Sequence, residues 1–246
     1  MSAELKVESE KLNARSKKSN VGYIPYFQLS TFSFQLFLSA TLLMAHLLPW
    51  ASHSTAALTL SGNDLAFFTH FTPGAGIFRN EWFYLPVWAS ALQLISFAMR
   101  RGRVSNMLGA GVGCAIAMLA LPRYQFLVAL RAAVRQHGVW VGLTEFQFGL
   151  QLILTCAVVV AILVLAMIAP RLPQPGTSLR LVILLDFVCL LMCIVPVIGL
   201  LSVQSAIETL YQSKIAFGLG WWLTLFAILG LTGSAVLKLR QLFIHK

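Results

Sequence analysis

Charged residues are scarce in this chain. Only 11% of its 246 residues are Asp, Glu, Lys or Arg, whereas soluble domains carry about 25%. Hydrophobic residues make up 58%, and the mean hydropathy is +0.80. A chain this poor in charge cannot cover a water-facing surface, which excludes an ordinary soluble protein and points to a membrane protein.

Familiar catalytic motifs are also missing. The sequence contains no HExxH, GxSxG, paired-aspartate or Walker pattern. An intramembrane aspartyl protease needs two acids within the membrane, but only Asp186 lies in an apolar run. The cysteines and histidines match no zinc spacing. We therefore predict a non-catalytic protein with no metal site and no cofactor.

Long apolar runs are what the sequence has instead. A run of about 20 apolar residues can cross a bilayer as a helix, and continuous runs favour helices over a barrel. The sequence predicts an all-α polytopic membrane protein with six transmembrane helices in three hairpins, at residues 28–48, 82–99, 104–121, 150–169, 181–201 and 218–237.

The distribution of Lys and Arg predicts the orientation. Most of them flank the runs on one side, in the N-terminal tail, the links 100–103 and 170–180, and the C-terminal tail. The positive-inside rule then places both termini in the cytoplasm and the protein in the plasma (inner) membrane. We expect a disordered cytoplasmic tail over residues 1–20 and a single six-helix transmembrane domain over 21–246. Because the basic residues form no stripe, nucleic acid is not an expected partner.

The predicted outer loops carry helical patterns and tryptophans. Apolar spacing at 61–74, 123–138 and 202–214 predicts short helices lying in the membrane interface. Indole rings favour the headgroup level. An outer aromatic belt is expected from Trp50, Trp82, Trp88, Trp140, Trp221 and Trp222.

Small residues recur every fourth position in the third run. Gly109, Gly113 and Ala117 share one face of a helix there. Such a stripe lets two helix backbones approach closely in a membrane. We interpret it as a helix-packing surface.

Asp186 is the one acid inside an apolar run, in "LRLVILLDFVCLLMCIVPVIGLL" (179–201). A charge at the bilayer centre costs about 2.5–3.5 kcal/mol, so the side chain should face the bundle and find a cation. The expected partner is Arg100, Arg101 or Arg103, at the inner ends of the second and third runs. Two alternatives stay open: a cation on another subunit, or proton coupling in a transporter.

These features favour an accessory or scaffold subunit of a larger membrane assembly, with lipids and other membrane-protein subunits as partners. The alternative is a small transporter or permease component that uses Asp186 as a coupling group. The other polar residues of the runs, such as Gln35, Gln93 and Gln151, look scattered and outline no polar path, which a transporter usually needs.

Overall fold

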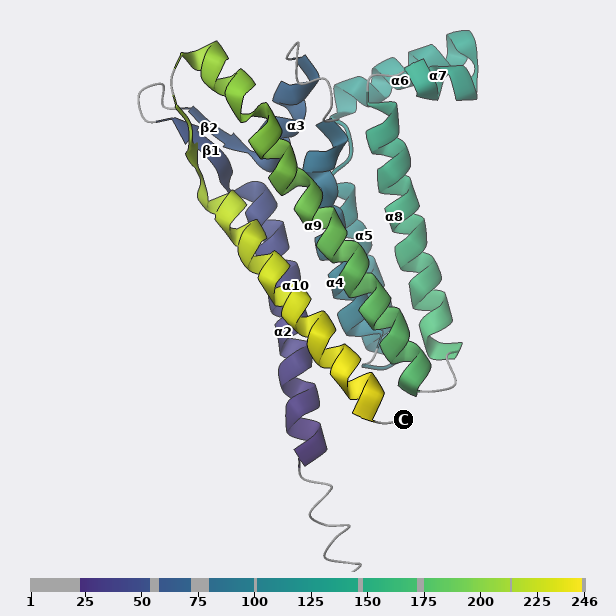
Figure 1. Ribbon diagram of the computed structural model, residues 1–246. Helices are drawn as coiled ribbons and strands as arrows, with labels where there is room; N and C mark the ends of the chain where they lie inside the picture. Colours follow the sequence, from purple (N-terminus) through teal and green to yellow (C-terminus); the bar gives the residue numbers. More distant parts are fainter. Residues whose placement is uncertain are drawn as a thin grey trace, which may run out of the picture.

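The computed structural model is dominated by long helices (Figure 1). It describes residues 23–53, 58–71, 80–99, 101–145, 148–171, 175–212 and 214–244. The tail predicted over residues 1–20 lies outside these ranges. The main helices are α2 (Tyr23–Leu47), α4 (Leu85–Ala98), α5 (Arg103–Met118), α8 (Gly149–Ile168), α9 (Pro175–Tyr211) and α10 (Leu219–Ile244).

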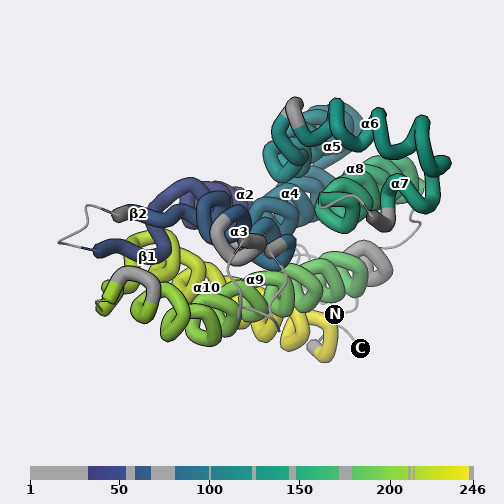
Figure 2. The backbone as a smooth tube through the Cα atoms, turned by 90° about the horizontal axis from the view of Figure 1, so that it is seen from above, coloured from purple at the N-terminus to yellow at the C-terminus, as the bar shows by residue number. Residues whose placement is uncertain are grey.

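Four of these helices form the core bundle. Helix α4 packs against both α2 and α9, and α10 packs against α2 and α9. Their interior is mainly apolar, with Leu38, Leu42, Ile95, Leu200 and Leu231 fully buried. Helices α5 and α8 lie beside α4 as a separate layer, which Figure 2 shows from above. The core therefore sits around α4.

Within the part of the chain that the structure describes, three helices are long and apolar enough to cross a membrane: Gly149–Arg171, Leu179–Thr209 and Leu219–Phe243. These match the last three predicted spans and support a membrane-embedded protein. The described apolar part of α2, Ser33–Leu47, is shorter. Helices α4 and α5 have 14 and 16 residues, fewer than the roughly 20 that a straight crossing needs. Six spans in three hairpins therefore stay a prediction.

A small antiparallel sheet, which the sequence does not predict, closes one end of a molecule that is otherwise mostly helical. Strand β1 (Pro49–His53) lies between β2 (Leu58–Ser61) and β3 (Ala216–Phe217). The backbone N–H of Gly218 also donates to the Trp50 carbonyl at 2.8 Å. A Cβ at Gly218 would lie 2.2 Å from the Pro49 carbonyl oxygen, so the close approach requires glycine. These strands are too short to show an alternating pattern, and β3 pairs with a distant part of the chain.

Short helices lie at the end of the molecule that carries the sheet. They are α3 (Gly62–Phe71), η1 (Asn80–Tyr84), α6 (Tyr124–His137) and α7 (Val139–Glu145), while η2 (Ala169–Arg171) follows α8 at the other end. The expected helices of the first two outer loops are present. In the third loop, by contrast, α9 runs on without a break to Tyr211. Glu208 stabilises the turn after it by accepting from Gln204 Nε2 (2.9 Å) and the Ile215 N–H (3.2 Å).

Candidate functional site

A buried group of polar side chains joins three helices of the bundle. Asp186 of α9 is 0% exposed, and Lys238 of α10 is 2% exposed. Lys238 Nζ lies 2.5 Å from Asp186 Oδ2, which also accepts from Ser234 Oγ at 3.3 Å. Gln93 Nε2 of α4 donates to Oδ1 at 3.0 Å. We call Gln93, Asp186, Ser234 and Lys238 the Asp186 cluster.

Helix geometry explains why these side chains meet. Ser234 and Lys238 lie one turn apart on α10 and so point to the same side. Helices α9 and α10 run side by side (Figure 1). At 1.5 Å per residue, Asp186 lies roughly 16 Å from the start of α9 and Lys238 roughly 9 Å from the end of α10. A turn further along α9, Cys189 Sγ donates to the Ala89 carbonyl of α4 at 3.6 Å, which adds a second polar contact between these two helices.

The expected arginine partner was wrong, because the described contacts of Asp186 are with Gln93, Ser234 and Lys238. Arg101 is exposed, with its guanidinium 4.4 Å from the centroid of the Phe97 ring. Arg103 is exposed at the start of α5, and Arg100 lies outside the described residues. Sequence reasoning missed Lys238 because it follows the last apolar run and so resembled a cytoplasmic flanking charge. One signal could have indicated that Lys238 is buried: it lies one helical turn after Ser234, on the same helix face as buried Leu231.

The cluster neutralises a charge that burial would otherwise make costly. Two buried opposite charges offset each other's desolvation only when hydrogen bonds satisfy the remaining polar groups. Both carboxylate oxygens have donors. Removing one partner of such a pair costs about 3–5 kcal/mol, because the other charge is left uncompensated. The arrangement therefore links α4, α9 and α10 through one buried polar cluster.

A second set of polar contacts joins α2 to α4. Ser39 Oγ donates to the Ser90 carbonyl at 2.9 Å, and Ser90 Oγ donates to the Ser39 carbonyl at 2.7 Å. Gln35 Nε2 donates to Ser96 Oγ at 3.3 Å. Polar residues that look scattered in the sequence thus gather on α4, with Gln93 facing α9 and the two serines facing α2. Gln93 Oε1 is buried without a hydrogen-bond partner.

The small-residue stripe of α5 faces α4. A Cβ at Gly109 would lie 2.2 Å from Ala98 Cβ, and one at Gly113 would lie 3.3 Å from the Ala91 carbonyl oxygen. Ala117 is buried as well. A Cβ at Gly111, which lies off the stripe, would meet nothing within 4 Å. The two helices can approach closely because these positions lack larger side chains.

The predicted tryptophan belt divides into buried and exposed rings. Trp50 lies in β1, Trp82 in η1 and Trp140 in α7, while Trp88, Trp221 and Trp222 lie in the first turns of α4 and α10. Trp50 and Trp88 are fully buried, so for them the belt prediction was wrong. Trp50 Nε1 donates to the Ala45 carbonyl at 2.6 Å, which ties the sheet to α2. Trp221 is buried too and Trp82 is half-buried, whereas Trp140 and Trp222 are exposed. The buried rings belong to the apolar core, where β1 packs against α2 and α10 and η1 packs against α4 and α9.

We predict that Asp186 and Lys238 are energetically coupled. Asp186→Leu and Lys238→Met should each destabilise the protein by about 3–5 kcal/mol, because each removes one member of the buried ion pair. The double variant should recover most of that loss, since it buries no charge. Melting curves of the four proteins in detergent, combined as a double-mutant cycle, measure the coupling. Additive losses would show that the two side chains do not interact.

The glycine stripe gives a second prediction. Gly113→Leu should lower the melting temperature strongly, because the new side chain would push α5 away from Ala91 and Ile162. Gly111→Leu is the matched control, and it should leave the melting temperature almost unchanged because its side chain enters open space. Equal melting temperatures for the two variants would mean that this face of α5 does not make the close approach.

Comparison with known proteins gives no family assignment. No family model, curated protein or solved structure matches the chain. Within the described residues, no three His, Cys, Asp or Glu side chains are placed to hold a metal ion. The role of the site must therefore be argued from its own groups: a buried ion pair with amide and hydroxyl hydrogen bonds.

Proposed function

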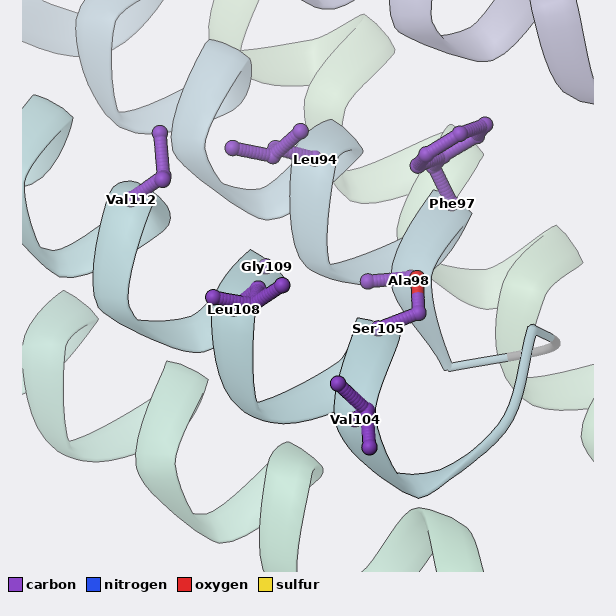
Figure 3. A pocket seen from close by; sticks show the side chains of 8 residues that line it. All are labelled: Leu94, Phe97, Ala98, Val104, Ser105, Leu108, Gly109 and Val112. Carbon is purple, nitrogen blue, oxygen red and sulfur yellow. The ribbon is translucent and has the colours of Figure 1, made fainter.

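We propose that this protein is a non-catalytic accessory or scaffold subunit of a larger membrane assembly. The observation that carries the proposal is an apolar groove between α4 and α5 on the surface of the helix bundle, with a volume of about 390 Å³ (Figure 3). Its lining is Leu94, Phe97, Ala98, Val104, Ser105, Leu108, Gly109 and Val112. A groove of this composition suits a transmembrane helix of another subunit.

The exposed side chains of α5 support a contact with protein. Val104, Leu108 and Val112 are all exposed and lie on the side of α5 that lines the groove. Gly109 keeps the groove deep, because it brings the α4 and α5 backbones together. Helices associate in membranes through such close van der Waals packing at small residues. None of the side chains that line this groove is charged.

The Asp186 cluster supports a structural role for Asp186. Asp186 is fully buried and paired within its own chain, so it needs no cation from elsewhere. A clamp of this kind keeps α4 in place, and α4 forms one wall of the groove. The scaffold proposal thus joins the buried polar contacts to the outer surface.

A second candidate is a small transporter or permease component that uses Asp186 as its coupling group. The observation that favours it is the unpartnered Gln93 Oε1 beside the ion pair, together with the hydrogen-bonded serines along α2 and α4. A proton taken up by Asp186 would break the pair with Lys238. Under this proposal, the Asp186→Leu/Lys238→Met protein would be stable but inactive, whereas a scaffold would keep its partners.

The proposed topology has six spans, both termini in the cytoplasm and the sheet end outside. The basic flanks support it through the positive-inside rule. Helices α6 and α7 then lie at the outer surface with exposed Trp140, as interfacial helices do. We place the protein in the plasma (inner) membrane.

Thiol labelling tests this topology. In a cysteine-free background, cysteines at Ser61, Arg131 and Gln212 should react with an impermeant reagent added to intact cells. Cysteines at Gly176 and Arg240 should react only after the membrane is opened. Labelling of the cysteines at positions 176 and 240 in intact cells would contradict the proposed orientation.

Photo-crosslinking tests the scaffold function. A photoreactive residue at Leu108, in the groove, should yield an adduct of defined mass with another membrane protein. The same residue at Leu229 is the matched control, since Leu229 is exposed on α10 away from the groove, and it should yield lipid adducts alone. The Leu108 adduct should persist in the Asp186→Leu/Lys238→Met protein. Lipid adducts alone at both positions would refute the scaffold proposal.

A further inference from the structure

A second groove lies on the other side of α5, facing α8, and its chemistry differs from that of the first. Its volume is about 740 Å³. Its lining is Arg103, Asn106, Met107, Ala110, Gly111, Leu163, Ala166, Met167, Pro170 and Arg171. Arg103 begins α5 and Arg171 ends η2, so both arginines lie at the same end of the groove, while the rest of the wall is mainly apolar.

The two arginines are available to a ligand. Both side chains are exposed, and neither forms an ion pair with a residue that the structure describes. No acidic side chain is among the residues that line the groove. Guanidinium groups bind phosphate oxygens through paired N–H donors, so this end of the groove suits a phosphate group.

Asn106 independently points to a ligand. It is 2% exposed and lines the groove one helical turn from Arg103. Its Nδ2 donates to the Ala166 carbonyl of α8 at 2.6 Å, but its Oδ1 is buried without a hydrogen-bond partner. A buried acceptor without a partner costs about 1–3 kcal/mol. A donor from a molecule held at the arginines would remove that cost.

The walls select an amphiphile over a free anion. Met107, Leu163 and Met167 are exposed apolar side chains, and Gly111 leaves open space above the helix surface. Inorganic phosphate would leave this surface uncovered, whereas an acyl chain would cover it. Basic pockets between transmembrane helices on the cytoplasmic side bind anionic lipid headgroups.

We propose that the α5–α8 groove binds an anionic phospholipid. Arg103 and Arg171 hold its phosphate, a headgroup hydroxyl donates to Asn106 Oδ1, and an acyl chain lies along Met107, Gly111 and Leu163. The proposal requires that the protein lies in a membrane. It does not depend on the scaffold role, which uses the other groove.

Lipid titration of the purified full-length protein in detergent, followed by native mass spectrometry, tests the proposal. Phosphatidylglycerol should bind more tightly than phosphatidylcholine, and inorganic phosphate should not displace it. Arg103→Gln/Arg171→Gln should weaken phosphatidylglycerol binding about thirtyfold, from loss of two phosphate contacts. The matched control, Arg180→Gln/Arg240→Gln, removes two exposed arginines outside the groove and should bind as the wild type does.

A second variant keeps the test decisive if the arginine variant does not fold. Gly111→Phe keeps both arginines, and its ring should occupy the groove, because a Cβ at position 111 meets nothing within 4 Å and Gly111 lines the groove. It should melt as the wild type does and lose phosphatidylglycerol binding. Equal binding by Gly111→Phe and the wild type would overturn the proposal. So would equal wild-type affinity for the two lipids, or displacement by inorganic phosphate, which would indicate a simple anion site.

Discussion

The ion pair between Asp186 and Lys238 imposes the strictest condition on this fold. Both groups are buried among apolar helices, where an unpaired charge is costly. The pair is satisfied only if α9 and α10 lie at one particular height and rotation, and Gln93 extends the same condition to α4. Apolar packing alone tolerates many such arrangements, since hydrophobic contact is not directional. The cluster therefore selects one register from a set of similar apolar packings.

Helix α4 transmits this condition to the rest of the molecule. It contacts α2 through the Ser39–Ser90 bonds, α9 through Gln93, and α5 through the Gly109–Ala98 approach. Its position fixes the depth of the groove that we propose as a subunit contact. Helix α5 in turn divides two grooves of different chemistry, one without charge and one with arginines at its end. The proposed scaffold and lipid sites thus share one wall.

Much of the helical framework could be predicted from the sequence, because long apolar runs have few structural solutions in a membrane. The runs at 150–169, 181–201 and 218–237 correspond to helices able to span it. The sheet could not be predicted, since β3 is two residues long and pairs with a distant strand. The burial of Asp186 followed from its cost in lipid. The partner of Asp186 could not be predicted in the same way, because Lys238 follows the last apolar run and faces the interior only through its position around the axis of α10. The burial of Trp50 and Trp88 was not predicted for a related reason, because it depends on contacts with segments that are distant in the sequence.

The most direct test of the central claim measures the Asp186–Lys238 contact itself. Asp64 and Asp186 are the only aspartates of the chain, so labelling aspartate carboxyls with carbon-13 and lysine amines with nitrogen-15 gives few signals. Solid-state NMR of the protein in lipid bilayers should show a carbon–nitrogen dipolar coupling for Asp186, as expected from the 2.5 Å contact between Oδ2 and Nζ. The coupling should vanish in Lys238→Met. Absence of the coupling in the wild-type protein, or its survival in Lys238→Met, would contradict this account.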